Sequence, residues 1–278
     1  MLPYPHIDPV IVSLGPLKIR WYGLMYVLGF LATWFLVRYQ ARQHRWEALL
    51  TRLDNLNMWL IIGVILGGRL GYVFFYNPGY YLKHPLDIVA TWQGGMSFHG
   101  GCLGVILAGI LFCRRYGLDF WKTADLYVVT VPIGLGLGRL GNFINGELFG
   151  RVTDVPWAMI FPGGGEAPRH PSQLYELFLE GVVLFLILWS CRNMPWKPGG
   201  RKSWPHGSLL ALFLVCYGAF RIFVELYREP DPQVGTLAFS LTMGQVLSLA
   251  MILAGILLWF LRSSAASKTT RTKRLRPR

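Results

Sequence analysis

The stretch Gly138-Arg139-Leu140-Gly141-Asn142-Phe143-Ile144-Asn145-Gly146-Glu147-Leu148-Phe149-Gly150 places charged and amide side chains at the end of an apolar run that begins near Ala124. A run of this length can cross a bilayer, since a transmembrane helix needs about 20 predominantly apolar residues. A charge at membrane depth costs about 2.5–3.5 kcal/mol or more unless it is paired or hydrated. Arg139 therefore requires a compensating partner, and an anionic ligand is the first candidate.

The composition is that of a polytopic membrane protein. Of the 278 residues, 53% are hydrophobic and only 15% are charged, whereas a soluble domain carries about 25% charged residues. The apolar residues predict an all-α fold with seven transmembrane helices and a small outer, periplasmic loop region. The seven predicted runs are approximately Trp21–Val37, Asn57–Tyr76, Gly95–Cys113, Ala124–Phe143, Gln173–Ser190, Gly207–Tyr227 and Thr242–Leu261.

Basic residues predict how these runs are oriented. Most of the 27 lysines and arginines follow the first, third, fifth and seventh runs, and cytoplasmic loops are enriched in such residues. We therefore expect one transmembrane domain over residues 1–262 with its N-terminus outside, followed by a basic cytoplasmic tail over residues 263–278. The tail is interpreted as an anchor on anionic membrane lipid. It has no interleaved aromatic residues, so nucleic acid is not an expected partner.

With this orientation, the polar residues inside the runs all fall in the outer half of the membrane. Runs that cross from inside to outside carry an arginine in their second halves: Arg69, Arg139 and Arg221. Runs that cross from outside to inside carry Tyr22, His99, Glu176 and Glu180 in their first halves. Glu225 follows Arg221 by one helical turn. The convergence of all these residues predicts a functional site at the depth of the outer leaflet.

Arginine at this depth is suited to phosphate, because its guanidinium stays charged and binds oxyanions with two parallel hydrogen bonds. A second interpretation is open for Arg139 and Arg221, namely structural pairing with Glu147, Glu180 or Glu225. For Arg69, both interpretations stay open: a structural role in helix packing and a role in ligand binding.

His99 follows Gly94-Gly95-Met96-Ser97-Phe98 and is either a general base or a hydrogen-bonded structural group at a helix start. Cys102, three residues further on, is interpreted as a buried packing residue and not as a nucleophile. The four cysteines show no metal-type spacing and no disulfide pattern, so we expect neither a metal site nor a cofactor.

Glycines predict where helices pack closely. The pairs Gly63/Gly67, Gly67/Gly71, Gly100/Gly104 and Gly134/Gly138 have small-xxx-small spacing. In contrast, Gly94-Gly95 and Gly163-Gly164-Gly165 are interpreted as loop hinges.

Six sequence blocks resemble the bacterial prolipoprotein diacylglyceryl transferases, along nearly the whole chain and in the same order. The blocks are Trp21-Tyr22-Gly23-Leu24-Met25-Tyr26, Gly67-Gly68-Arg69-Leu70-Gly71-Tyr72, Gly95-Met96-Ser97-Phe98-His99-Gly100-Gly101, Gly138 to Gly150, Arg169-His170-Pro171-Ser172-Gln173-Leu174-Tyr175-Glu176, and Arg221-x-x-x-Glu225. One departure is the short glycine-rich segment between Phe161 and Arg169, where some relatives carry a larger insertion.

The resemblance implies a seven-helix enzyme of the bacterial inner membrane. Such an enzyme moves the diacylglyceryl group of phosphatidylglycerol onto the lipobox cysteine of a preprolipoprotein signal peptide, forming a thioether and releasing glycerol 1-phosphate. By the same resemblance, His99, Arg139 and Arg221 are the catalytic candidates. The candidates for binding phosphatidylglycerol are Arg139, Arg69, Tyr22, Asn142, Asn145, Glu147, Gly150 and Glu225.

Two other classes fit seven apolar runs. A secondary transporter also keeps charges in its helices, but it commonly shows internal repeats or broken helices near the midplane, and no repeat is evident. A seven-helix retinal protein needs an intramembrane lysine for its Schiff base, and every lysine here lies in a predicted loop or tail.

Overall fold

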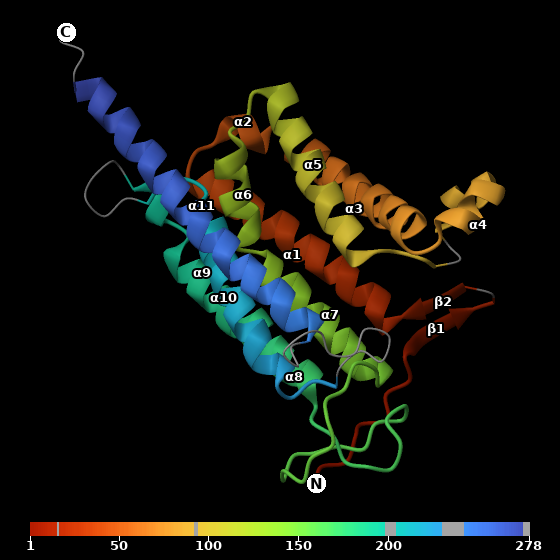
Figure 1. Ribbon diagram of the computed structural model, residues 1–278. Coiled ribbons are helices and arrows are strands. Elements are labelled where there is room, and N and C mark those ends of the chain that lie inside the picture. Colours follow the sequence, from red (N-terminus) through yellow and green to blue (C-terminus); the bar gives the residue numbers. More distant parts are fainter. Residues whose placement is uncertain (16, 92–93, 198–203, 230–241, 275–278) are drawn as a thin grey trace. The chain divides into compact units, whose positions relative to one another are not determined.

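The computed structural model describes residues 1–15, 17–91, 94–197, 204–229 and 242–274 (Figure 1). Its strands and helices are β1 (Val10–Leu14), β2 (Leu17–Arg20), α1 (Trp21–Gln43), α2 (Glu47–Leu50), α3 (Leu53–Phe75), α4 (Pro78–Lys83), η1 (Pro85–Val89), α5 (Phe98–Tyr116), α6 (Phe120–Val128), α7 (Val131–Asn145), α8 (Ser172–Glu176), η3 (Leu177–Val183), α9 (Leu184–Cys191), η4 (Met194–Trp196), α10 (Ser208–Glu225) and α11 (Met243–Arg274).

The predicted seven spans are confirmed. Within the described residues, seven helical segments are long and apolar enough to cross a membrane. They are Trp21–Gln43, Leu53–Phe75, Phe98–Tyr116, Phe120–Asn145, Ser172–Trp196, Ser208–Glu225 and Met243–Ala265. The backbone of the basic tail continues α11 to Arg274, whereas the side chains of residues 266–278 lie outside the described part, so the anchoring role of the tail stays a prediction.

The chain divides into two compact units, and each is described by itself. Unit 1 comprises Met1–Val37 and Ala124–Arg278, and unit 2 comprises Arg38–Thr123. The prediction of one transmembrane domain over residues 1–262 stays a prediction.

Unit 2 is built on the close packing of α3 against α5, and the predicted glycine contacts between them are confirmed. A Cβ added at Gly63 would lie 2.8 Å from the Ala108 Cβ, and one added at Gly71 would lie 2.8 Å from the Gly100 Cα. Real Cβ contacts are essentially never this short, so larger side chains would force the helices apart. In membranes, this backbone proximity supplies the van der Waals contact that holds helices together.

In unit 1, the fourth predicted span is broken into α6 and α7. Pro132 lacks a backbone N–H and its ring clashes with the carbonyl four residues earlier, and that residue, Val128, is the last of α6. The predicted close approach through Gly134 and Gly138 is wrong for Gly138, where an added Cβ would meet nothing within 4 Å. The close contact of α7 instead involves Gly136, whose added Cβ would lie 3.2 Å from the Gly181 Cα of η3.

The region before the first span contains an ordered N-terminal segment and a hairpin, neither of which the apolar runs predicted. β1 and β2 pair antiparallel directly before α1. The Tyr4 hydroxyl donates to the carbonyl of Phe143 at 2.7 Å, and its ring packs with Phe143, Met159 and Phe161. This aromatic cluster attaches the start of the chain to the end of α7.

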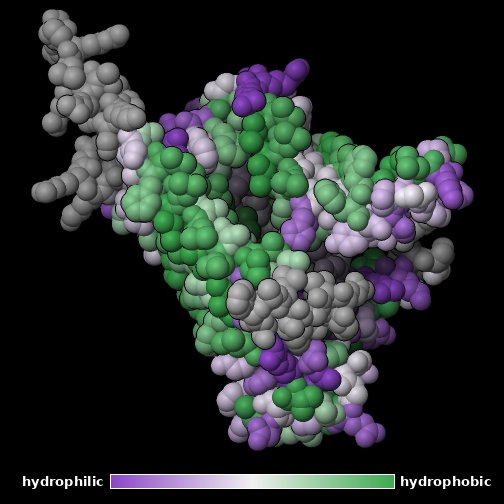
Figure 2. Space-filling view, in the orientation of Figure 1, coloured by the Kyte–Doolittle hydropathy of each residue, from purple (hydrophilic) through white to green (hydrophobic). Residues whose placement is uncertain are grey.

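The long helices expose apolar side chains, as a lipid-facing surface requires. Figure 2 shows a continuous hydrophobic surface along α10 and α11 of unit 1, and these two helices pack against each other. Leu253, Leu257 and Phe260 of α11 are each about 60% exposed or more. In water such a surface would be a liability, whereas in a bilayer it contacts acyl chains.

A buried carboxylate of unit 1 caps a neighbouring helix. Asp125 on α6 is fully buried and accepts backbone N–H groups of Gly207, Leu209 and Leu210 at 2.8, 3.1 and 3.2 Å. These groups lie at the start of α10, where the first four N–H groups have no partner inside the helix. Asp125 therefore connects two spans through the positive end of the α10 dipole.

Asp125→Ala is expected to lower stability, because it leaves three N–H groups without their acceptor; one unsatisfied buried donor costs about 1–3 kcal/mol. The measurement is thermal unfolding in detergent. Asp119→Ala is the matched control, since the carboxylate of the exposed Asp119 accepts the Lys122 N–H at 3.0 Å and no second N–H among the described hydrogen bonds. Equal losses in the two variants would contradict the capping role of Asp125.

Candidate active site

Three guanidiniums of unit 1 converge on one buried carboxylate. Glu176, whose side chain is 1% exposed, forms ion pairs with Arg139, with Arg221 at 3.1 Å and with Arg228 at 3.5 Å. Its contact with Arg139, through Nε and Oε2, is the closest of the three. A carboxylate of this burial is stable as an anion only with such partners.

Helix geometry brings two further carboxylates to the same place. Glu225 follows Arg221 by four residues on α10, and their side chains pair at 3.0 Å. Glu180 lies 3.9 Å from Arg221 and belongs to η3, a π-helical segment that begins directly after Glu176. A π-helix has more than four residues per turn, so Glu176 and Glu180 are turned toward one face; such segments are frequent at functional sites.

The start of α11 closes this cluster on the side of Glu225. A Cβ added at Gly244 would lie 2.8–2.9 Å from the Glu225 carboxylate atoms. Thr242 and Gln245 form a reciprocal cap there, with hydrogen bonds of 3.1 and 3.2 Å. Glycine at position 244 is thus what allows the carboxylate to reach the positive end of this helix.

The two interpretations left open for the arginines can now be compared with the contacts. Arg221 does pair with Glu180 and Glu225, as the structural interpretation anticipated. Arg139 pairs with Glu176, which was not among its anticipated partners. Carboxylate pairing and phosphate binding use the same guanidinium donors. The observed ion pairs therefore do not test phosphate binding, which stays a prediction.

Arg228 belongs to the cluster, although it lies one residue beyond the predicted run Gly207–Tyr227. Its side chain is 9% exposed and pairs with Glu176. The signal that could have found it is the spacing Arg221, Glu225, Arg228, because residues three and four apart share one helix face.

The signature stretch forms a compact turn after α7. Asn142 and Asn145 donate their amide groups to the Glu147 carboxylate at 2.9 and 3.1 Å. Gly146 ends the helix in the left-handed region, with φ of 68°, which glycine adopts without steric cost. Glu147 is therefore held by the two predicted asparagines and does not contact Arg139 through any described ion pair.

Backbone contacts join this turn to the block that carries Glu176. The Gln173 side chain donates to the Glu147 carbonyl at 2.7 Å, and the Gly150 N–H donates to the His170 carbonyl at 2.8 Å. A Cβ at Gly150 would lie 2.7 Å from the His170 Cβ, so no larger residue fits without displacement. Gly150 thus has a packing role in this structure, and its predicted lipid contact stays a prediction.

Tyr22 contacts the same helix as Arg139. Its ring lies where a Cβ at Gly141 would be, at 2.7 Å, and its hydroxyl is 3.2 Å from that of Tyr26. Tyr22 is the second residue of α1, so this contact connects the first span to α7 two residues after Arg139.

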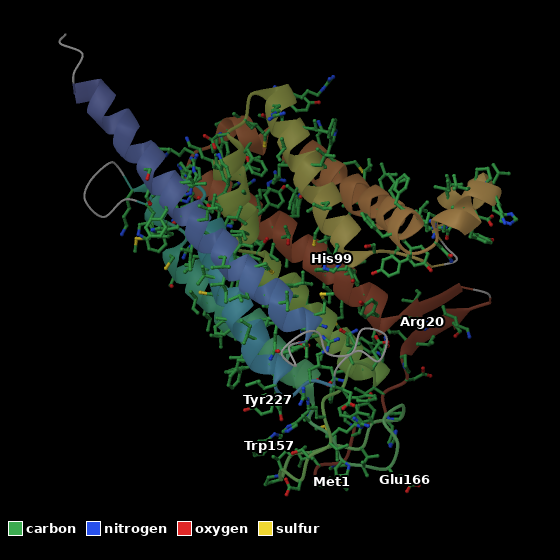
Figure 3. All side chains as sticks on the ribbon, in the orientation of Figure 1. Met1, Arg20, His99, Trp157, Glu166 and Tyr227 are labelled. Carbon is green, nitrogen blue, oxygen red and sulfur yellow. The ribbon has the colours of Figure 1, made fainter. Side chains whose placement is uncertain are left out.

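Polar and aromatic side chains organise the segment between α7 and α8 beside this site. Arg169 donates to the carbonyls of Gly164 and Gly150 at 2.9 and 3.2 Å, which holds the glycine-rich segment in place. Trp157 donates to the Tyr175 hydroxyl at 2.6 Å, and His170 lies 3.1 Å from that hydroxyl. Figure 3 shows Trp157 and Tyr227 in this part of unit 1. Burial lowers the pKa of His170, which favours its neutral form.

In unit 2, the guanidinium of Arg69 is surrounded by backbone carbonyls. It donates to Asp87 and Ile88 at 2.5 and 2.8 Å and to Gly94 and Gly95 at 2.6 and 3.1 Å. Gly95 has a φ of 74°, and a Cβ there would lie 2.8 Å from the Arg69 Nη1. Arg69 therefore orders the loop before α5 in this structure, and its predicted role in binding phosphatidylglycerol stays a prediction.

His99 lies in the first turn of α5, where its side chain is exposed (Figure 3). Ser97 caps this helix by accepting the Gly100 N–H at 3.2 Å, so the cap belongs to serine and not to the histidine. His99 belongs to unit 2 and the arginine cluster to unit 1, so its role beside them stays a prediction.

The interpretation of Cys102 as a buried packing residue is wrong, because Cys102 is exposed. The reason is the direction of its side chain: α5 packs on α3 through Gly100 and Gly104, and Cys102 lies between these positions on another face. Within the described residues, no group of three or more His, Cys, Asp or Glu could hold a metal ion.

Comparison with known proteins identifies the family. The family model for prolipoprotein diacylglyceryl transferase matches residues 9–261. The chain belongs to this family. The match extends over all seven spans up to the last residues of the seventh, and it includes each of the six resembling blocks.

Curated relatives agree over nearly full length. The chain is similar to proteins named phosphatidylglycerol--prolipoprotein diacylglyceryl transferase from three bacteria. The protein from Desulfotalea psychrophila is 61% identical over 96% of this chain and 97% of the relative. The one from Geobacter sulfurreducens is 56% identical over 91% and 94%. The one from Nitrosomonas europaea is 51% identical over 100% and 98%.

Proposed function

We propose that this protein transfers the sn-1,2-diacylglyceryl group of phosphatidylglycerol to the lipobox cysteine thiol of preprolipoproteins. The reaction forms a thioether, releases glycerol 1-phosphate and is the first step of lipoprotein maturation. The observation that supports it most directly is the 61% identity to a relative named for this activity, over nearly the full chain. Seven membrane-spanning segments suit a lipid substrate.

The reaction makes a definite demand on the site. The thiolate sulfur attacks the sn-3 carbon of the diacylglyceryl group, the C–S bond forms, and the C–O bond to phosphate breaks. The electron pair of that bond leaves with the phosphate, which becomes a monoester. Negative charge therefore grows on the phosphate in the transition state, and fixed cationic donors in a dry site stabilise it.

Arg139 and Arg221 are the residues that we assign to this phosphate. Both lie in the buried cluster of unit 1, with exposed side-chain fractions of 19% and 13%. Asn142, Asn145 and Glu147 form the adjoining turn, and Tyr22 packs against α7 beside Arg139. In this assignment, these residues bind the lipid head group, and Glu225 orients Arg221 through their 3.0 Å contact.

The thiol proton needs an acceptor, because a free cysteine has a pKa near 8.5 and its thiolate is the nucleophile. We assign this step to His99, whose exposed imidazole at the start of α5 is the expected acceptor near neutral pH. The nucleophile belongs to the peptide substrate, so no covalent intermediate on Cys102 is part of this scheme.

We further propose that the protein lies in the bacterial inner membrane with its N-terminus outside. The excess of lysine and arginine after the first, third, fifth and seventh spans supports this orientation. It places the arginine cluster in the outer half of the membrane, where signal peptides and the outer-leaflet lipid are both accessible.

A fluorescent reporter fused after Arg278 should be active in the cytoplasm, and a reporter active only outside would contradict the orientation.

Arg139→Lys is expected to reduce transfer about 10²–10³-fold, the loss typical for one preorganised oxyanion donor. A lysine keeps the charge but cannot form two parallel hydrogen bonds. The assay combines phosphatidylglycerol vesicles with a lipobox peptide and measures the thioether product. Arg192→Lys is the control, since Arg192 donates to the Trp189 carbonyl at 2.7 Å, at the opposite end of the span that carries Glu176. A fully active Arg139→Lys enzyme would exclude the bidentate role.

His99→Gln is expected to slow transfer about 10²–10⁴-fold near neutral pH, as loss of a general base does. Raising the pH toward the thiol pKa should partly restore the rate, because more thiolate forms without the base. The measurement is the pH–rate profile of the variant and the wild type with one peptide. A variant equally slow at every pH would instead indicate positioning, and wild-type rates would remove His99 from the mechanism.

A further inference from the structure

Glu176 holds a place in the arginine cluster that no other carboxylate shares. It contacts the guanidiniums of Arg139, Arg221 and Arg228, whereas Glu180 and Glu225 each contact only Arg221 among the described ion pairs. The three arginines come from α7, from α10 and from the turn after α10. Their common focus is therefore the position of a single anionic group.

The pairs around Glu176 are close but poorly directed. Within the described residues, both Glu176 oxygens and the Arg221 Nη1 lack a hydrogen bond of good geometry, although Arg221 Nη1 lies 3.1 Å from Glu176 Oε1. Arg69 is the contrast, because its guanidinium makes four hydrogen bonds to backbone carbonyls. Arg221 Nη1 is thus held by charge, and this donor is available to a better-matched oxyanion.

Charge balance sets what happens when such an anion arrives. Arg139, Arg221 and Arg228 are matched in number by Glu176, Glu180 and Glu225. A phosphodiester that enters adds negative charge to a balanced cluster in a medium of low dielectric, where repulsion between like charges is strong. One carboxylate must therefore lose its contacts with the guanidiniums.

We propose that Glu176 is an internal competitor for the phosphate of the lipid substrate. It keeps the three guanidiniums converged while the site holds no lipid, and the phosphodiester exchanges with it on binding. When the phosphate monoester leaves, the carboxylate returns and speeds its release. Glu176 is a positioning residue in this scheme, which rests on the proposed function because it deepens the role of Arg139 and Arg221.

The test compares Glu176→Gln with the wild type in the vesicle and lipobox-peptide assay. Glutamine keeps the size of the side chain but not the charge, so the KM for phosphatidylglycerol should fall about tenfold, the factor that one charge-assisted contact contributes. Inhibition by glycerol 1-phosphate should strengthen by a similar factor. The kcat should fall, because release of the product anion becomes slower.

Two further variants make the result specific. Glu180→Gln removes the same charge from the same helix face, but Glu180 is 3.9 Å from Arg221 alone, so its KM should change much less. Glu176→Asp keeps the charge on a shorter side chain, competes less well and should lower the KM by a smaller factor than glutamine does. If Glu176→Gln does not accumulate in the membrane, the aspartate variant decides, and an unchanged or raised KM in it overturns the proposal.

Other outcomes are equally decisive. A raised or unchanged KM with weaker inhibition by glycerol 1-phosphate means that Glu176 only supports the fold. Equal tightening in Glu176→Gln and Glu180→Gln means that net charge acts and that Glu176 is no specific competitor. Thermal stabilisation of the purified protein by glycerol 1-phosphate measures anion binding without transfer. Suppose that glycerol 1-phosphate binds more tightly to Glu176→Gln than to the wild type, and that the wild type shows no transfer. That result would overturn the proposed reaction but not the exchange.

Discussion

The burial of Glu176 among guanidiniums is the constraint on which the rest of unit 1 depends. A carboxylate with 1% exposure, within a segment that can span a membrane, cannot be hydrated by bulk water. Neutralisation must come from the protein, and the partners lie on α7 and α10 and just after α10. Removing one partner from such a cluster leaves an uncompensated charge and costs about 3–5 kcal/mol. The cluster therefore holds these helices in register.

Helix irregularities make this convergence possible. The break before α7 follows from Pro132, and beyond it Gly136 approaches Gly181 of the π-helical segment. That segment begins after Glu176 and contains Glu180, so both carboxylates are turned toward the arginines. Gly244 allows the start of α11 to reach Glu225. Larger side chains at Gly136, Gly181 and Gly244 would force these close approaches apart.

How far the sequence predicts this protein depends on the range of each interaction. Apolar runs predicted all seven spans, because spanning is a property of local composition. Glycine spacing predicted close packing at positions of α3 and α5, but it did not predict that these two helices pack on each other. The partner of Arg139 depends on which helices meet, and no local pattern specifies that. Arg228 did carry a local signal, its spacing from Arg221 and Glu225. Tyr4 was missed for a related reason, since its hydroxyl and ring contact residues about 140 positions away. The hairpin is a local pairing that a search for long apolar runs does not detect.

Arginine at membrane depth has two different roles in this chain, and its partners distinguish them. Backbone carbonyls around Arg69 are neutral and fixed, so its hydrogen bonds order a loop. Carboxylates around Arg139 and Arg221 are charged and lie on rotatable side chains, and they leave the Arg221 Nη1 without a hydrogen bond among the described residues. In the proposed reaction, a phosphate that gains charge uses donors of this second kind. The arginine cluster of unit 1 would then combine two properties, since the charges that stabilise the ligand-free fold are the ones that we propose for the phosphodiester.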